Sequence, residues 1–233
     1  IPTITTLARP SPLAALPAAP RLWRRVASPP GVTVSGARWI EIDAPEDRKM
    51  LAAVFRPKGA GPFPAVVFLH GTHGLREHYL QAVKDLSQAG FVVVAGGWFG
   101  GHYTDEEGDP TTYEDGVTWP NGPALEPGTS PGSFYNILAL VTAVRTLNSV
   151  RPDRVGLFGH SRGAVAALAF TFREERIQAV VAWAGFPPIG MITDIRTPVL
   201  MLESTTDPYF PLSEAQAFER ALRSAGYPVE AVY

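Results

Sequence analysis

Residues 154–170 read RVGLF-GHSRG-AVAALAF, and this stretch decides the fold. The apolar run at 154–158 is typical of a buried strand, and the Ala-rich run at 164–170 is typical of a helix. Between them, residues 159–163 fit the pattern G-x-S-x-G. A serine on such a sharp strand-to-helix turn is held in a strained conformation, with its hydroxyl above the sheet. The stretch therefore predicts a nucleophile at Ser161, against the alternative of a tight turn without chemistry.

Outward from this stretch, strand and helix signals alternate along the chain. Residues 32–42 and 50–56 alternate apolar and polar side chains, as half-buried antiparallel strands do. Further strands are predicted at 65–69, 91–95, 177–184, 197–203 and 229–233. Helices are predicted at 77–89, 133–148, 161–172 and 213–225. The sequence thus predicts an α/β fold, with a mostly parallel twisted sheet, helices on both faces and antiparallel N-terminal strands.

The composition excludes several classes of protein. The chain has 233 residues, of which 45% are hydrophobic, and this suits one globular domain with a real core. A formal net charge of -2 gives no general attraction to nucleic acid. The lack of cysteine excludes disulfides, a Cys nucleophile and a thiolate metal site. No apolar run approaches the roughly 18 residues that span a bilayer, and no metal or other cofactor is implied.

The N-terminal segment differs from the rest of the chain. Prolines at 2, 10, 12, 17, 20, 29 and 30 forbid a long helix and predict an extended arm over 1–30. The remaining residues, 31–233, are expected to form the catalytic domain. Because the chain begins at Ile1 rather than Met, we expect processing or trimming. Removal of a secretory signal would explain this start and favours a secreted or periplasmic location, with a trimmed cytoplasmic protein as the alternative.

Residues 100–132 form a long stretch without periodicity, rich in Gly, Pro and acids. Loops of this length in a compact domain are usually functional or disordered. We expect Tyr103, Tyr113 and Trp119 to line a substrate cleft. Calcium binding by the acids at 105, 106, 107 and 109 is disfavoured, because their spacing does not match the EF-hand pattern.

Donors for an oxyanion are expected at two places. The backbone N–H of Arg162 lies at the predicted helix start and points toward the developing charge. A second donor should follow an earlier strand. There the sequence reads HGTHG at 70–74, and the N–H of Thr72 is the candidate, with His73 as the near alternative.

The acid that orients a catalytic base should follow a later strand, between nucleophile and histidine in chain order. Asp207 lies in the loop after the strand predicted at 197–203. Asp194 is the rival, but it precedes that strand and so lies at the wrong end.

These features resemble the α/β-hydrolase superfamily, and within it the dienelactone hydrolase-like serine esterases. The resemblance covers roughly residues 32–233 and rests on LHGTHG at 69–74, GHSRG at 159–163 and PVLMLESTTDPYFP at 198–211. Dienelactone hydrolase itself uses a cysteine nucleophile, whereas this chain has Ser161. That departure points to ordinary carboxylic esters. Cutinase- and polyester hydrolase-like enzymes share the elbow, so small and polymeric esters are both open as substrates.

The base is the unresolved part of this interpretation. A serine hydroxyl needs an adjacent base at neutral pH. In the superfamily that histidine follows the last strand, and no histidine follows Asp207 here. Three alternatives are open. The base is carried by a C-terminal segment beyond Tyr233, or a histidine from elsewhere in the chain acts as the base, or the protein is a non-catalytic relative. The first alternative is favoured. We expect His70 and His160 to be structural and His78 to be solvated, and a role for His102 as a substitute base is disfavoured.

The sequence therefore predicts a serine hydrolase that cleaves carboxylic esters through an acyl-enzyme intermediate. Ser161 and Asp207 are its catalytic residues, and Thr72 and Arg162 form its oxyanion hole. Substrate contacts are expected from His73, Trp98 and Trp183. The alternative is a binding or scaffold protein on the same fold.

Overall fold

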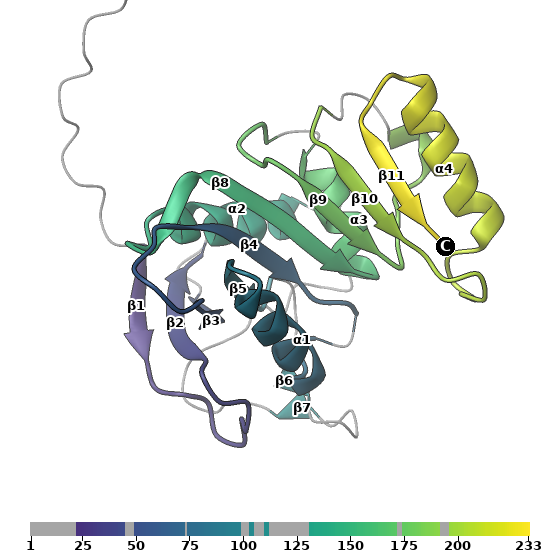
Figure 1. Ribbon diagram of the computed structural model, residues 1–233. Helices are drawn as coiled ribbons and strands as arrows, with labels where there is room; N and C mark the ends of the chain where they lie inside the picture. The colour runs from purple at the N-terminus through teal and green to yellow at the C-terminus, as the bar shows by residue number, and fades with distance from the viewer. Residues whose placement is uncertain are drawn as a thin grey trace, which may run out of the picture.

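The computed structural model describes residues 22–44, 49–72, 74–98, 103–104, 110–111, 131–171, 174–191 and 196–233. Within these residues, nine strands form one sheet in the order β1-β2-β3-β5-β4-β8-β9-β10-β11 (Figure 1). Their bounds are β1 Trp23–Val26, β2 Arg38–Asp43, β3 Lys49–Phe55, β4 Phe63–Leu69, β5 Val92–Gly96, β8 Val150–His160, β9 Val180–Trp183, β10 Val199–Leu202 and β11 Val229–Val232.

The kind of strand pairing changes once across the sheet, from antiparallel to parallel. β1, β2, β3 and β5 pair antiparallel in succession. From β5 onward every pair is parallel, through β4, β8, β9, β10 and β11. This confirms the predicted mostly parallel sheet with antiparallel N-terminal strands. Because parallel strands end at the same edge, the loops after β4, β8, β9 and β10 meet at one side of the molecule.

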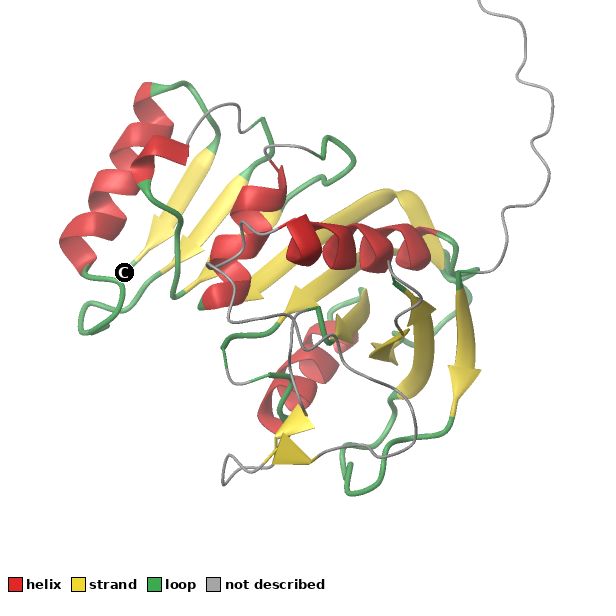
Figure 2. Cartoon of the chain, turned by 180° about the vertical axis from the view of Figure 1, so that it is seen from behind, coloured by secondary structure: helices red, strands yellow, loops and turns green. Residues whose placement is uncertain are grey.

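Helices cover both faces of the sheet, as predicted. The helix α1 (Glu77–Gln88) packs on one face, over a core that includes Phe55, Phe68 and Leu80. The helices α2 (Pro131–Arg145), α3 (Arg162–Thr171) and α4 (Leu212–Ser224) contribute to the larger core on the other face. Figure 2 shows α2 and α3 in front of the sheet, with α1 behind it. None of the helices in the described ranges is long and apolar enough to cross a membrane.

The structure differs from the sequence prediction at the start of the sheet. Residues 23–26, which we expected in the Pro-rich arm, form β1, with Trp23 paired to Ile42. Prolines at 20 and 29 flank a proline-free stretch, which leaves these N–H groups available to a partner strand. The next strand begins at Arg38 rather than at 32, because Gly31 and Gly36 adopt φ of 77° and 91° and turn the chain.

The long loop before α2 holds a little regular structure. Strands β6 (Tyr103–Thr104) and β7 (Pro110–Thr111) pair antiparallel. The 3₁₀ turn η1 (Ile189–Met191) follows β9 later in the chain. Tyr113, Trp119, Asp194 and the acids at 105–109 lie outside the described residues, as does His102.

Candidate active site

Ser161 lies between β8 and α3 in a backbone conformation that is rare for a side chain with a Cβ. Its φ is +53°, and such a conformation costs on the order of 1–3 kcal/mol unless the surroundings enforce it. The Ser161 N–H donates to the carbonyl of Trp183 at 2.8 Å, and its own carbonyl accepts the N–H of Ala164 at 2.9 Å. The strained residue is therefore fixed on both sides, as the strand-to-helix motif predicts.

Three glycines allow the chain to crowd around Ser161. A Cβ on Gly159 would collide with the carbonyl of Gly163, and a Cβ on Gly163 would collide with the carbonyl of Leu69 at the end of β4. On Gly185, in the loop after β9, a Cβ would lie 2.6 Å from the Ser161 carbonyl oxygen. Backbone atoms cannot move aside as a flexible side chain can. The absence of side chains at these positions is thus required for the approach of β4, β8, β9 and α3.

The loop after β4 passes directly beside Ser161, the candidate nucleophile. We call residues 70–72 the oxyanion turn, after the role that the sequence predicts for them. A Cβ built on Gly71 would lie 3.3 Å from the Ser161 Cβ, and the exposed Thr72 follows it. Arg162 is the first residue of α3, so no carbonyl of that helix accepts its N–H. The structure thus brings both candidate donor segments to Ser161, whereas His73 lies outside the described residues.

Asp207 lies in the loop between β10 and α4. Its Oδ1 accepts the N–H groups of Tyr209 at 2.8 Å and Phe210 at 3.0 Å, which fixes the carboxylate. Because Asp207 follows the parallel strand β10 and Ser161 follows the parallel strand β8, both residues lie at the same edge of the sheet. The other carboxylate oxygen of Asp207 makes no hydrogen bond within the described part of the chain, and is available to orient a base.

The two tryptophans expected to contact substrate have different surroundings. Trp183 ends β9 with 40% of its surface exposed, and its ring lies 4.4 Å from that of His160. Trp98 is fully buried and donates from Nε1 to the carbonyl of His70 at 3.1 Å. Buried Asn136 in turn donates to the Trp98 carbonyl at 2.9 Å. Trp183 thus offers a surface beside Ser161, whereas Trp98 has no exposed surface for a substrate and braces the oxyanion turn.

The described histidines do not supply the missing base. His70 is fully buried, and its Nδ1 lies 2.8 Å from the carbonyl of Gly71. Burial lowers the pKa of His70 to about 4, so the ring is neutral at pH 7. The His160 ring turns toward Tyr79, and His78 is exposed in the first turn of α1. Within the described residues, no histidine is hydrogen-bonded to the Ser161 hydroxyl.

A family comparison agrees with this arrangement. The model of the dienelactone hydrolase family matches residues 50–233, well over half of the chain. The chain belongs to the dienelactone hydrolase family. The match begins in β3 and includes the oxyanion turn, the elbow and Asp207, so the family assignment covers the whole candidate site and identifies the protein as a hydrolase.

Individual relatives of this dienelactone hydrolase family member are distant. A Salmonella typhi protein provisionally named carboxymethylenebutenolidase is 25% identical over 231 residues, covering 94% of this chain and 81% of the relative. A crystal structure of a dienelactone hydrolase-like promiscuous phosphotriesterase from metagenomic libraries has a TM-score of 0.65 at 18% identity, covering 84% of this chain and 80% of that one. The structure of Est1E from Butyrivibrio proteoclasticus has a TM-score of 0.60 at 17% identity, covering 85% and 88%. At these identities, the solved structures support the fold alone.

Sequence reasoning missed Tyr79, which joins the two halves of the site. Its hydroxyl lies 2.6 Å from Nδ1 of His160 and also packs against Gly71, where an added Cβ would lie 3.1 Å from the hydroxyl oxygen. Burial raises the pKa of the Tyr79 hydroxyl and lowers that of His160, so at neutral pH the phenol keeps its proton and the ring is neutral, and the two share a hydrogen bond whose direction is set by the tautomer of the ring. Tyr79 therefore ties the oxyanion turn to the end of β8. A tyrosine in the first turn of a helix carries no sequence signal for this role.

Glu203 is the second residue that the sequence did not single out. It follows β10 directly and is only 6% exposed, and its Oε1 accepts the N–H of Gly185 at 3.3 Å. Burial, and to a lesser degree the charge of Asp207, raise the pKa of Glu203 to about 7. Gly185 in turn packs against the Ser161 carbonyl, so Glu203 supports the turn around Ser161 through Gly185. The sequence offers one indication of this role, namely a carboxyl at the end of a predicted buried strand, four residues before Asp207.

Proposed function

We propose that this protein is a serine hydrolase that cleaves carboxylic esters through an acyl-enzyme intermediate. The observation that carries the proposal is the conformation of Ser161, held at φ +53° against backbone atoms of three neighbouring segments. Strain of this kind persists where surrounding structure enforces it, and it clusters at active sites. The family assignment supports hydrolysis, and the serine supports an ester as the substrate.

In the proposed reaction, the Ser161 Oγ attacks the ester carbonyl carbon while its proton passes to a histidine outside the described residues, which Asp207 would orient. The carbonyl oxygen becomes an oxyanion, which accepts hydrogen bonds from the N–H groups of Thr72 and Arg162. Loss of one such donor costs on the order of 3 kcal/mol of transition-state stabilisation. The C–O bond to the alcohol then breaks, the histidine gives its proton to the leaving alkoxide, and water releases the acid from Ser161. Small and polymeric esters both fit this chemistry, and Trp183 offers an exposed ring for the acyl or alcohol part.

A panel of p-nitrophenyl esters of increasing acyl length tests the proposal, together with a fluorophosphonate probe. We expect hydrolysis and probe labelling in the wild type, and loss of both in Ser161→Ala. Asp207→Asn should label at least tenfold more slowly than the wild type while keeping the fold. Hydrolysis that is unchanged in Ser161→Ala would refute the assignment of the nucleophile.

A binding or scaffold function is the second candidate. It is favoured by one observation, namely that no histidine in the described part of the chain is bonded to the Ser161 hydroxyl. The fluorophosphonate probe separates the two candidates, because only an activated serine reacts quickly. A folded protein that neither labels nor hydrolyses any ester of the panel would support the scaffold function.

A further inference from the structure

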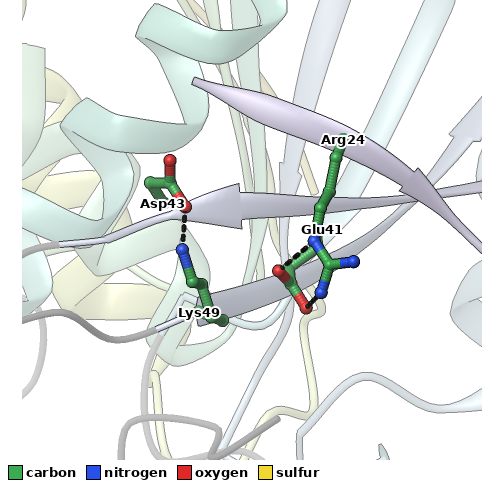
Figure 3. A network of polar contacts seen from close by, with 4 residues as sticks. All are labelled: Arg24, Glu41, Asp43 and Lys49. Atoms are coloured by element: carbon green, nitrogen blue, oxygen red, sulfur yellow. Dashed lines mark hydrogen bonds and ion pairs between the residues drawn. The ribbon is translucent and has the colours of Figure 1, made fainter. Parts of the chain in front are cut away.

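The three antiparallel strands β1, β2 and β3 carry charged side chains on both of their faces, and the two faces differ. On one face the charges are paired. Arg24 binds the buried Glu41 through two hydrogen bonds of 2.7 and 3.0 Å, and Lys49 binds Asp43 (Figure 3). The strand register places these pairs side by side, with Arg24 opposite Glu41 and Asp43 opposite Lys49.

The other face carries arginines without acids. Arg25 stands opposite Ile40 on β1 and β2, Arg38 stands opposite Val54 on β2 and β3, and Arg56 follows β3 by one residue. Successive side chains on a strand alternate between faces, so all three arginines lie on the face opposite the Arg24–Glu41 pair. They line an open cavity of about 350 Å³ together with Trp23, Asn148 and Ser149. We call this space the arginine cavity.

The positive charge of the arginine cavity is not neutralised by the protein around it. Arg25 and Arg38 make no hydrogen bond or ion pair with any described residue. Arg56 donates to the carbonyls of Gly59 and Ala60, which carry no net charge. No acid lines the cavity among the residues that the structure describes, and the sequence before Glu41 contains no Asp or Glu. Three guanidinium groups therefore share one cavity in a protein whose net charge is -2.

We propose that the arginine cavity binds an organic phosphate, that is, a phosphoryl group attached to a flat apolar body. Guanidinium groups match phosphate oxygens with two parallel hydrogen bonds, and Asn148 and Ser149 can add neutral donors. The Trp23 ring is fixed by a 2.9 Å bond from Nε1 to Thr146. With Ile40 and Val54 it forms an apolar wall for the organic part. The volume lies at the lower end of the range for small-molecule sites.

The arginine cavity is separate from the candidate active site. Ser149, at its rim, immediately precedes β8, and Ser161 immediately follows the same strand. Phe63 and Leu69 of the neighbouring strand β4 pair with Val150 and Gly159, so the two ends of β8 lie on the order of 20 Å apart. The proposal therefore does not depend on ester hydrolysis, and its test does not require the protein to be catalytically active.

Titration calorimetry with phenyl phosphate as the probe tests the proposal in the full chain. We expect phenyl phosphate to bind at least about tenfold more tightly than inorganic phosphate or benzoate, because each comparator lacks one of the two parts. The double substitution Arg25→Gln/Arg38→Gln should weaken binding at least about thirtyfold, since each guanidinium contributes charge-assisted hydrogen bonds. Unfolding curves of the double variant should remain close to those of the wild type, because both side chains are exposed and unpaired in the described structure.

Two matched controls make the result specific. Arg220→Gln removes the same charge from exposed α4, at the other end of the sheet, and should leave phenyl phosphate binding unchanged. Ser161→Ala should leave it unchanged as well, which excludes binding at the nucleophile. The proposal is overturned by equal binding of phenyl phosphate to the wild type and the double variant. Equal weakening by Arg220→Gln, or equal affinity for benzoate, would also overturn it, because either result indicates a general charge effect.

Discussion

Replacement of Glu203 by glutamine removes one buried ionisable group and keeps an oxygen that can accept the N–H of Gly185. In the folded protein the pKa of Glu203 is raised to about 7 from a reference value of 4.5, because burial penalises the carboxylate. Between these two pH values the folded protein holds a proton that the unfolded chain has released. Stability therefore falls as the pH rises through this window. The difference of about 2.5 pKa units corresponds to about 3 kcal/mol of unfolding free energy.

The measurement is the free energy of unfolding by urea at about pH 4.5 and pH 8 for the wild type and Glu203→Gln. At the lower pH we expect the two proteins to have similar stability, because the wild-type carboxyl is protonated. At the higher pH the variant should be more stable by about 3 kcal/mol. His70, whose pKa is lowered to about 4, makes stability rise with pH between 4 and 6.5, but it does so in both proteins and cancels in the difference. The matched control, Glu230→Gln, removes an exposed carboxyl from β11 and should change stability by less than about 0.5 kcal/mol at either pH. A constant difference between wild type and Glu203→Gln across the range would refute the reasoning.

Three further predictions concern the nucleophile turn. Gly163→Ala should destabilise the protein by about 3 kcal/mol or more in thermal unfolding, because the added Cβ would collide with backbone atoms. The control Gly190→Ala should change stability by less than about 0.5 kcal/mol, because no atom lies within 4 Å of a Cβ added there. Ser161→Gly should abolish fluorophosphonate labelling and raise the unfolding free energy by about 1 kcal/mol, since glycine adopts φ +53° without strain; a loss of stability would contradict the strain. Tyr79→Phe should slow labelling of Ser161 by about tenfold at a stability loss near 1 kcal/mol, because the oxyanion turn loses its link to β8. Unchanged labelling in a folded Tyr79→Phe protein would show that the link has no part in reactivity.

The residues that sequence reasoning located are those whose signal is local. The elbow at 159–163 is recognisable because a strand, a tight turn and a helix lie consecutively in the chain, and the structure places Ser161 at that turn. Asp207 could be inferred because the carboxyl ends of parallel strands meet at one edge. The sheet and its parallel order followed from the same alternation of strands and helices.

The residues that it missed act through contacts between distant segments. Tyr79 lies 81 positions from His160, and nothing in the sequence around either residue encodes their hydrogen bond. Glu203 was passed over because a strand-ending acid is usually solvated, and its burial depends on how β9 and β11 pack beside it. Trp98 was expected at the substrate because aromatic residues after a strand often line clefts, but its indole is buried and serves the fold. The strand β1 was missed because proline spacing in the arm concealed a short proline-free segment.

The close contacts around Ser161 distinguish residues that the backbone geometry requires from a residue that only the chemistry requires. Gly159 and Gly163 are required by the geometry of the backbone, whatever the protein does, since any side chain there would force the strands and α3 apart. Under the proposed mechanism, Ser161 is required only by the chemistry, and its left-handed conformation destabilises the fold once that chemistry is lost. A descendant of this chain that abandoned hydrolysis would therefore keep both glycines and exchange the serine, most readily for glycine. Comparison of these three positions among close relatives would then show which lineages have kept catalysis and which have lost it.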